Sequence, residues 1–139
     1  MDVVFVAGVT PIVRDPVAGD AFYRQALGLP LQGEGYLFSE FVEGVKHLGV
    51  WPLSQAASSC FGTPEWPHDM PVPQATIEFE LGDPDAVAAG VRELEAKGYP
   101  IIHEAREEPW GQTVARLYGP EGLLIGLTHT PHLRDGEPA

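Results

Sequence analysis

The pattern of apolar and polar residues is similar in the two halves of the chain. A β-like stretch over residues 3–13 is followed by an amphipathic run with helical spacing over residues 15–28. A second β-like stretch over residues 74–81 is followed by a similar helical run over residues 83–98. Further β-like segments follow each run. A period of about half the chain length indicates one supersecondary unit used twice, and the cleft between the two copies is the place to look for function.

Each helical run has recognisable ends. Asp15 and Asp83 are of the residue type preferred at a helix N-cap, and each precedes a proline, which loses no hydrogen bond at the first helical position. Gly28 and Gly98 suit the left-handed position that ends a helix. The apolar residues predict a buried stripe on each helix, formed by Phe22, Tyr23, Ala26 and Leu27 in the first and by Val87, Val91 and Leu94 in the second.

The strands are indicated by alternation with a period of two. Along residues 75–81, Ile77 and Phe79 fall on one face of the predicted strand. Glycine-rich turns at 33–35 and 119–122 separate further strands. The other face of residues 75–81 carries Thr76, Glu78 and Glu80.

The element order is therefore β-α-β-β-β, twice. We predict an α+β fold in one domain over residues 1–139, in which two βαβββ modules form a curled mixed β-sheet cup with helices on its outer face. Module one covers residues 1–53 and module two residues 75–130. The aperiodic, proline-containing segment 54–74 is predicted to be a linker, and residues 131–139 a polar tail.

Composition narrows the range of partners. Eight basic and 20 acidic residues give a formal net charge of -12, which argues against nucleic acid and anionic membranes and is compatible with a cationic ligand. The single cysteine, Cys60, cannot form an internal disulfide, so a reducing compartment is expected. The N-terminus lacks the basic segment of a signal peptide, and no apolar run approaches the roughly 20 residues that cross a membrane. These features predict a cytoplasmic protein.

Three segments together resemble the vicinal oxygen chelate superfamily, also called the glyoxalase/bleomycin-resistance/dioxygenase family. Residues 10–31 are similar to the opening of the family's first module, and residues 75–101 to the opening of its second. Residues 107–131, which contain EEPWG and GPEGLLIGLTH, are similar to its closing strand pair. The resemblance extends over essentially the whole chain and implies the fold predicted above.

The family's metal-dependent members place one ligand on the first strand and one on the last strand of each module. In this chain the resemblance puts Gly8, Thr76 and Gly126 at three of these places and Trp51, or a neighbour such as Val50, at the fourth. Glycine and tryptophan side chains donate no lone pair to a divalent metal, and threonine is a poor ligand. We therefore expect neither metal nor cofactor. The alternative is a displaced metal site that uses His47, Glu78 and His103.

A metal-free cup resembles the branch of the family that confers resistance to bleomycin and mitomycin by sequestering the drug. Residues 108–111 and 64–66 carry this similarity. The branch implies a homodimer, and residues 63–74 offer a hinge for exchanging modules between chains. Two tryptophans would stack a planar ligand, acidic residues would attract a cation, and glycines would leave room. The residues expected to bind the ligand are Gly8, Trp51, Thr76, Glu78, Glu80, Trp110, Arg116 and Gly126.

Some of these residues have a second, structural interpretation. Trp110 either contacts ligand or closes the cup wall, and the two acidic residues face either the cup or solvent. Arg116 either clamps a ligand oxygen or pairs with an acidic neighbour, which we favour.

The first functional hypothesis is a dimeric, metal-independent protein that binds a small planar ligand without catalysis. The second is a metal-dependent lyase, isomerase or dioxygenase with the displaced site, and the third is an accessory protein with a vestigial cup.

Overall fold

The computed structural model describes residues 1–133. The strands are β1 (Phe5–Val13), β2 (Leu37–Ser39), β3 (Leu48–Pro52), β4 (Ala75–Glu80), β5 (Ile101–Glu107), β6 (Thr113–Tyr118) and β7 (Leu124–His129). The helices are α1 (Pro16–Gly19), which continues as the π-helix η1 (Asp20–Ala26), then α2 (Leu53–Phe61), α3 (Pro84–Ala96) and the short 3-10 helix η2 (Pro131–Leu133). Of the predicted polar tail, only the part that forms η2 belongs to the described residues.

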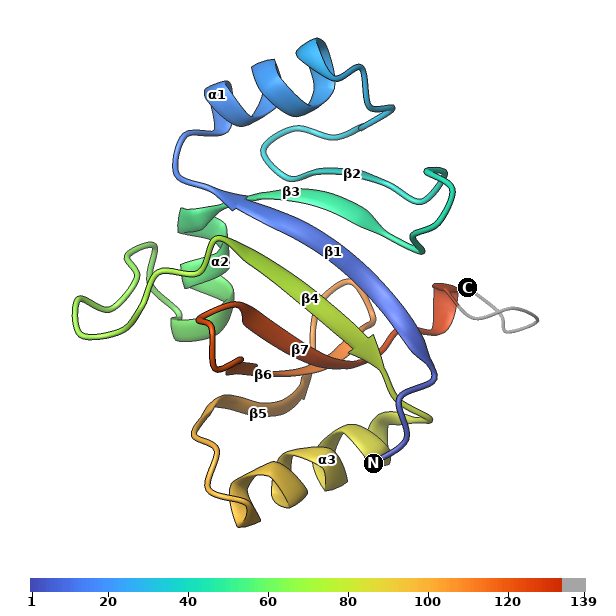
Figure 1. The fold of residues 1–139 in the computed structure, drawn as a ribbon, viewed down its shortest axis with the longest axis vertical. Helices are drawn as coiled ribbons and strands as arrows, with labels where there is room; N and C mark the ends of the chain where they lie inside the picture. Colours follow the sequence, from blue (N-terminus) through green and yellow to red (C-terminus); the bar gives the residue numbers. More distant parts are fainter. Residues whose placement is uncertain (134–139) are drawn as a thin grey trace.

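All seven strands form one open mixed sheet in the order β2-β3-β1-β4-β7-β6-β5 (Figure 1). β1 pairs in parallel with β3, and β4 pairs in parallel with β7, while β1 and β4 run antiparallel in the middle. The two halves of the sheet are thus related by an approximate two-fold axis between β1 and β4. This arrangement is the structural form of the internal repeat, and the α+β fold with a mixed sheet is confirmed.

The side chains of each strand alternate between two faces of the sheet, and the first and third helices cover the outer one. Ala115 and Leu117 of β6 pack with α3, and Leu48 and Val50 of β3 pack in a core with Tyr23 of η1. These helices lie at opposite ends of the molecule, with the sheet between them (Figure 1). The intervening residues, Arg116 among them, therefore face inward.

The predicted helix ends are confirmed. The Asp15 carboxylate accepts a hydrogen bond of 3.0 Å from the backbone N–H of Val17, and the Asp83 carboxylate accepts one of 2.8 Å from that of Ala86. Gly28 has a φ of 71°, in the left-handed region that glycine adopts without strain. The side-chain caps and the terminal glycine lie where the sequence places them.

The first helix differs from the prediction in the residues that it buries. Tyr23 packs against the module-one core, but Phe22 and Leu27 are 53% and 56% exposed. The reason is that Asp20–Ala26 is π-helical, with a wider turn than an α-helix, so a stripe counted at α-helical spacing drifts off the core. The buried stripe of α3 is confirmed, since Val87 and Val91 are buried.

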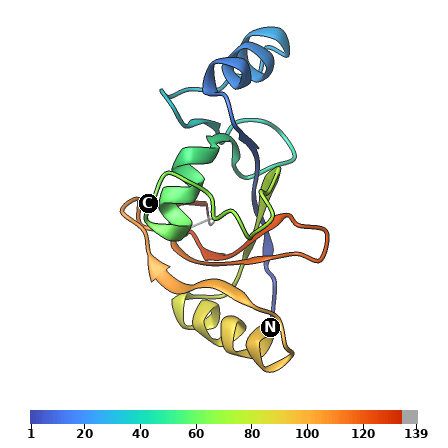
Figure 2. The ribbon, with the colours of Figure 1, turned by 90° about the vertical axis from the view of Figure 1, so that its left-hand side faces the viewer.

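Two further differences concern the first module and the linker. The expected second strand of module one is reduced to a single bridge between Gln32 and Phe38. The segment predicted to be an irregular linker contains α2, which places Cys60 in a core with Leu124 and Trp66. Figure 2 shows α2 beside the sheet, between the levels of α1 and α3. Burial raises the pKa of the Cys60 thiol despite the nearby Arg116, which disfavours the nucleophilic thiolate.

None of the helices within residues 1–133 is long and apolar enough to cross a membrane.

Candidate ligand-binding cavity

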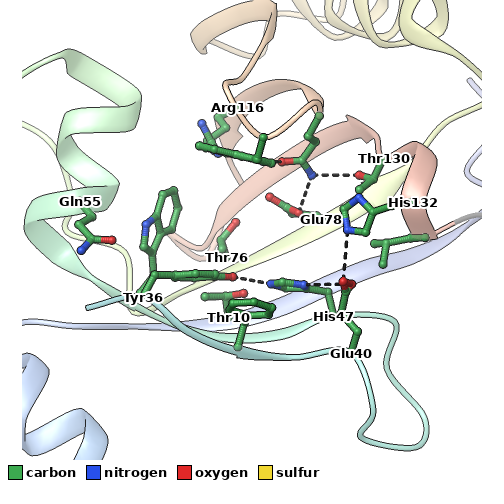
Figure 3. A pocket seen from close by; sticks show the side chains of 15 residues that line it. Thr10, Tyr36, Glu40, His47, Gln55, Thr76, Glu78, Arg116, Thr130 and His132 are labelled. Carbon is green, nitrogen blue, oxygen red and sulfur yellow. Dashed lines mark hydrogen bonds and ion pairs between the residues drawn. The ribbon is translucent and has the colours of Figure 1, made fainter. Parts of the chain in front are cut away.

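The inner face of the sheet borders a cavity of about 420 Å³ (Figure 3). Its walls come from five strands, the start of α2, the β2–β3 and β5–β6 connections and the residues that follow β7. The lining residues of this chain are Thr10, Tyr36, Phe38, Glu40, His47, Trp51, Gln55, Thr76, Glu78, Trp110, Gln112, Arg116, Thr130, His132 and Leu133.

Glu78 and Arg116 lie on either side of Gly126 in one row of paired residues across three strands. Glu78 of β4 is paired with Gly126 of β7, which is paired with Arg116 of β6. A Cβ added at Gly126 would lie 3.0 Å from Glu78 Cγ, so the Glu78 side chain leans across the glycine. None of the ion pairs formed by residues 1–133 includes Glu78. Its carboxylate is therefore available to a cation in the cavity.

Gln112 holds the Glu78 carboxylate in place. Its Nε2 donates to Glu78 Oε1 and to Thr130 Oγ1, both at 3.0 Å. Its Oε1 accepts a hydrogen bond of 2.9 Å from the indole N–H of Trp110 at the rim. The amide group of Gln112 thus connects the mouth of the cavity to the carboxylate, and both its oxygen and its nitrogen are used.

Aromatic rings form the opposite wall. The ring of Tyr36 lies nearly parallel to those of Phe38 and His47, with centroids 5.9 Å away in both cases, and Trp51 meets Tyr36 edge-on at 6.4 Å. A hydrogen bond of 2.6 Å joins Tyr36 Oη to His47 Nε2 (Figure 3). Burial, reinforced by the nearby Glu78 carboxylate, raises the pKa of Tyr36 far above its usual range. Tyr36 consequently keeps its proton and acts as a hydrogen-bond donor.

Glu40 joins two histidines at the mouth. Its carboxylate lies 3.3 Å from His132 Nε2 and 3.9 Å from His47 Nδ1. Burial lowers the pKa of His47, and the Glu40 carboxylate acts against that shift. The contacts bring the β2–β3 connection and η2 together over one side of the cavity.

Arg116 is the buried cation of the site. It is 1% exposed, and its guanidinium carbon lies 5.2 Å from the ring centre of Trp51. The acidic neighbour expected from the sequence is Glu108, at 3.5 Å from Nη1. Arg116 also lines the cavity, so the structure combines the two interpretations that the sequence left open.

The sheet register corrects one of the family's metal positions. Asp15 and Asp83 are 68 positions apart (83 minus 15), so Val9 of β1 corresponds to Ile77 of β4. Val9 is paired with Leu48 and Ile77 with Ile125. The module-one counterpart of Gly126 is therefore Gly49, and not Trp51, which lies two residues further along β3.

Neighbouring side chains occupy the space at these positions. A Cβ on Gly49 would lie only 2.2 Å from Tyr36 Oη, and one on Gly8 would lie 3.6 Å from Glu78 Oε1. The remaining position, Thr76, offers a neutral hydroxyl. No group of three or more His, Cys, Asp and Glu residues is arranged to hold a metal ion within residues 1–133. The residues present do not fit the metal of the family's enzymes.

The structure brings five of the eight predicted ligand-binding residues together. Trp51, Thr76, Glu78, Trp110 and Arg116 all line the cavity. Contact of these residues with a ligand remains a prediction.

The other three predicted residues do not line the cavity. Gly8 and Gly126 lie beneath the Glu78 side chain. Glu80 is on the expected face of β4 but is fully buried. Its carboxylate accepts hydrogen bonds from Thr128 Oγ1 at 2.9 Å and from the backbone N–H of Thr130 at 2.7 Å. The expectation that Glu80 contacts a ligand is corrected: it anchors the chain after β7.

Sequence reasoning missed Tyr36, Phe38 and Gln112, which come from the β2 region and the β5–β6 connection. Tyr36 and Phe38 follow a glycine turn and carry no motif, and Gln112 follows the Glu108–Gly111 segment without a pattern of its own. His47 was considered only as a metal ligand. The one available signal was the position of Gln112, directly beyond the segment that resembles the sequestering branch.

Comparison with known proteins identifies the family. The family model described as Glyoxalase/Bleomycin resistance protein/Dioxygenase superfamily matches residues 8–127. The chain belongs to this superfamily. A bleomycin resistance protein from Klebsiella pneumoniae is 28% identical over 119 residues, which cover 82% of this chain and 83% of that protein.

Solved structures of this superfamily have the same fold. The Mn(II)-bound glyoxalase from Novosphingobium aromaticivorans matches 91% of this chain and 39% of its own, with a TM-score of 0.60 and 20% identity. A variant of methylmalonyl-CoA epimerase from Streptomyces coelicolor matches 99% of this chain and 100% of its own, with a TM-score of 0.54 and 17% identity. At these identities the likeness concerns the fold alone.

Proposed function

We propose that this superfamily member binds and sequesters a flat, cationic small molecule, such as an antibiotic or a planar metabolite, without a metal and without changing it. One observation carries the proposal: the Glu78 carboxylate, with no cationic partner among residues 1–133, lies in a cavity walled by aromatic rings. A half-buried carboxylate without a cationic partner favours a positive charge beside it, and parallel or edge-on rings favour a flat partner. The net charge of -12 adds long-range attraction for cations.

The size of the cavity supports a drug-sized ligand. Its volume of about 420 Å³ lies in the lower part of the range typical of small-molecule sites. A compact ligand of the size of mitomycin is compatible with it, whereas a glycopeptide of the size of bleomycin exceeds it. The relationship to a bleomycin resistance protein supports sequestration as the mode of action. We therefore expect tighter binding of the compact drug class.

Titration calorimetry with naphthalene-2-carboxamidine, a flat cation, and with mitomycin C and bleomycin tests this function. The two compact compounds are expected to bind, and Glu78→Gln is expected to weaken the binding of the amidinium by about 1.5–3 kcal/mol, the usual value of a hydrogen bond to a charged group, and to leave the binding of uncharged mitomycin C nearly unchanged. Glu43→Gln, at an exposed position outside the lining, is the matched control. The bound drug should be recovered intact by mass spectrometry. Equal affinities of the two variants for every cationic drug that binds would contradict a role of Glu78.

The second candidate is a metal-dependent lyase, isomerase or dioxygenase with a displaced site. The observation in its favour is that His47 and Glu78 both line the cavity. The third residue of that hypothesis, His103, lies outside the lining and is hydrogen-bonded to Arg116 Nη1 at 3.0 Å. Elemental analysis after incubation with zinc, nickel, iron(II) and manganese decides between the candidates. One retained metal ion per chain, lost in His47→Ala, would favour the enzyme.

A further inference from the structure

The Arg116 guanidinium uses only one of its three nitrogens for protein contacts. The described contacts all go to Nη1, and its partners are Ser59 Oγ at 3.2 Å, His103 Nε2 at 3.0 Å and Glu108 Oε1 at 3.5 Å. Nε has no hydrogen-bond partner within residues 1–133, and none of the described hydrogen bonds uses Nη2. An arginine that is 1% exposed therefore has a buried Nε donor without a partner.

Arg116 borders the cavity, although the partners of its Nη1 do not. Ser59, His103 and Glu108 lie outside the cavity lining, whereas Arg116 belongs to it. In a planar guanidinium the edge formed by Nε and Nη2 lies opposite Nη1. We therefore take the Nε–Nη2 edge as the part of the group nearest the cavity, with Nε buried just behind its surface and the Trp51 ring centre 5.2 Å from the guanidinium carbon.

A second unpartnered donor lies on β4, two residues from Glu78. Thr76 Oγ1 has no hydrogen-bond partner among the described residues, and Thr76 is 2% exposed. Its hydroxyl rises from β4 into the space bordered by the labelled side chains of Figure 3. Buried donors of this kind are normally satisfied. The cavity wall thus has two unsatisfied donors, Arg116 Nε on β6 and Thr76 Oγ1 on β4, the strand that also carries Glu78.

We infer that the ligand carries, besides its cationic group, a planar pair of hydrogen-bond acceptors that binds the Nε–Nη2 edge of Arg116. A carboxylate is the strongest form of such a group, because its two oxygens match the arginine fork. This inference rests on the proposed function and adds a second polar end to the ligand.

The spacing of the sheet separates the two ends. Glu78 and Arg116 belong to one cross-strand row, two strands apart, which corresponds to about 10 Å between their Cα atoms. The ligand class is therefore a flat, ring-sized zwitterion or dipole, with its cation and its acceptor pair at opposite ends of the ring system.

The position of Glu108 affects whether the ligand's acceptor group must be negatively charged. It contacts Arg106 Nε at 3.0 Å and Arg116 Nη1 at 3.5 Å, so it partly balances the Arg116 charge. A neutral carboxamide, which offers a single carbonyl oxygen, would then also bind the edge, with fewer hydrogen bonds than a carboxylate. The test must separate these two acceptors.

Four naphthalenes test the inference by titration calorimetry on the full chain. The first has an amidinium at one end and a carboxylate at the other, the second an amidinium and a carboxamide, the third an amidinium alone, and the fourth a carboxylate alone. We expect the zwitterion to bind roughly 10- to 100-fold more tightly than the amidinium alone, the range of a charge-assisted hydrogen-bond pair. The carboxamide is expected to fall between them.

Arg116→Lys keeps the charge but removes the fork, and it should abolish the advantage of the zwitterion over the amidinium alone. Arg106→Lys is the matched control, because Arg106 contacts the same Glu108 and lies outside the cavity lining. Circular dichroism and thermal unfolding verify that both variants are folded. If Arg116→Lys fails to fold, the comparison of the four compounds on the unaltered protein still decides.

The outcomes separate the inference from the function on which it rests. Equal or tighter binding of the amidinium alone would overturn the acceptor end and leave the cation site intact. Tightest binding of the carboxylate alone would overturn the role given to Glu78. Absence of binding by all four compounds at millimolar concentration would overturn the proposed function together with the inference. An advantage of the zwitterion that persists in Arg116→Lys would place the acceptor elsewhere.

Discussion

Gly49 determines whether Tyr36 can reach the cavity. A Cβ at this position would lie 2.2 Å from Tyr36 Oη, so Gly49→Ala must displace the tyrosine and break its hydrogen bond to His47. We expect a loss of about 1–3 kcal/mol in the free energy of unfolding, as for other overpacked sites, measured by urea denaturation. Gly82→Ala is the control, since nothing lies within 4 Å of a Cβ there and φ is not positive. Equal stability of the two variants would contradict the close approach.

Trp110 is expected to contribute both a stacking surface and a hydrogen bond. It is 54% exposed at the rim and donates to Gln112 Oε1 at 2.9 Å. Trp110→Ala should weaken binding of a planar ligand by about 1–3 kcal/mol, from lost burial and stacking. Trp110→Phe keeps a ring and loses only the hydrogen bond, so titration calorimetry should show a smaller loss. If both variants bind as the unaltered protein does, Trp110 only closes the wall.

At the level of single residues, alternation predicted the inward face of β4 and therefore Thr76 and Glu78. It did not separate Glu78 from Glu80, because a period of two gives the face of a strand and not the position of the chain that covers it. The segment after β7 covers Glu80 and leaves Glu78 open. Tyr36 and Gln112 could not be predicted, because they meet Glu78 only through pairings far apart in the sequence.

The helix caps are the elements whose energetics follow most directly from the sequence. Asp83 Oδ1 accepts the N–H of Ala86, one of the unpaired donors at the start of α3. Asp83→Ala should lower the free energy of unfolding by about 0.5–2 kcal/mol, and Asp83→Ser should restore most of it. Thermal and urea unfolding of the three proteins measure this. If the Asp83→Ser variant is no more stable than the Asp83→Ala variant, the side chain at this position does not cap α3.

At the level of elements, the sequence was informative where helix ends carry side-chain caps and uninformative where they do not. α2 begins after Pro52 with no side-chain cap hydrogen bond, in a segment of small and polar residues, so no start was recognisable. It is stabilised by tertiary packing of residues such as Cys60 against Leu124. The missing second strand of module one has a comparable cause, because Gly33 and Gly35 both adopt positive φ and turn the chain early.

On the scale of the whole molecule, buried histidines make stability depend on pH. Burial lowers the pKa of His103 from its ordinary 6.5 to about 4. Nε2 accepts from Arg116, and Nδ1 lies 2.9 Å from the carbonyl of Glu104, which suits the neutral ring. The unfolded chain therefore binds more protons between these two pH values, and stability falls as pH drops through that window.

His103→Gln should flatten this decline. A glutamine oxygen can still accept a hydrogen bond from Arg116, whereas no group at this position then titrates. Urea unfolding from pH 7 to pH 4 gives the free energy of unfolding of the variant and of the unaltered protein. The carboxylates titrate in both proteins, so their contribution drops out of the difference between the two free energies. His68→Gln, at an exposed position, is the control. Parallel curves for His103→Gln and the unaltered protein would contradict the role of His103.

The approximate two-fold symmetry of the sheet leaves its central outer face without a helix. Val6 and Val9 of β1 are 45% and 36% exposed and are paired with Phe79 and Ile77 of β4. β1 and β4 lie between α1 and α3 (Figure 1), so these exposed valines form an apolar band in the middle of the face. An exposed apolar band of this kind favours association, and the position of this band on the two-fold axis suits an isologous pair. We therefore propose a homodimer across this face; exchange of modules between chains remains a second possible form of the same dimer.

Sedimentation velocity at micromolar concentration tests the dimer. We expect a dimer for the unaltered protein and a monomer for the double variant Val6→Glu, Val9→Glu, since opposing carboxylates would be placed in an apolar interface. Val72→Glu, at an exposed apolar residue that is 38% accessible and outside the sheet, is the matched control. Because Glu78, Arg116 and the aromatic wall all belong to one chain, we expect the monomeric variant still to bind a planar ligand. Loss of binding together with dissociation would mean that the partner chain completes the site, and a dimer that persists in the double variant would place the interface on another face.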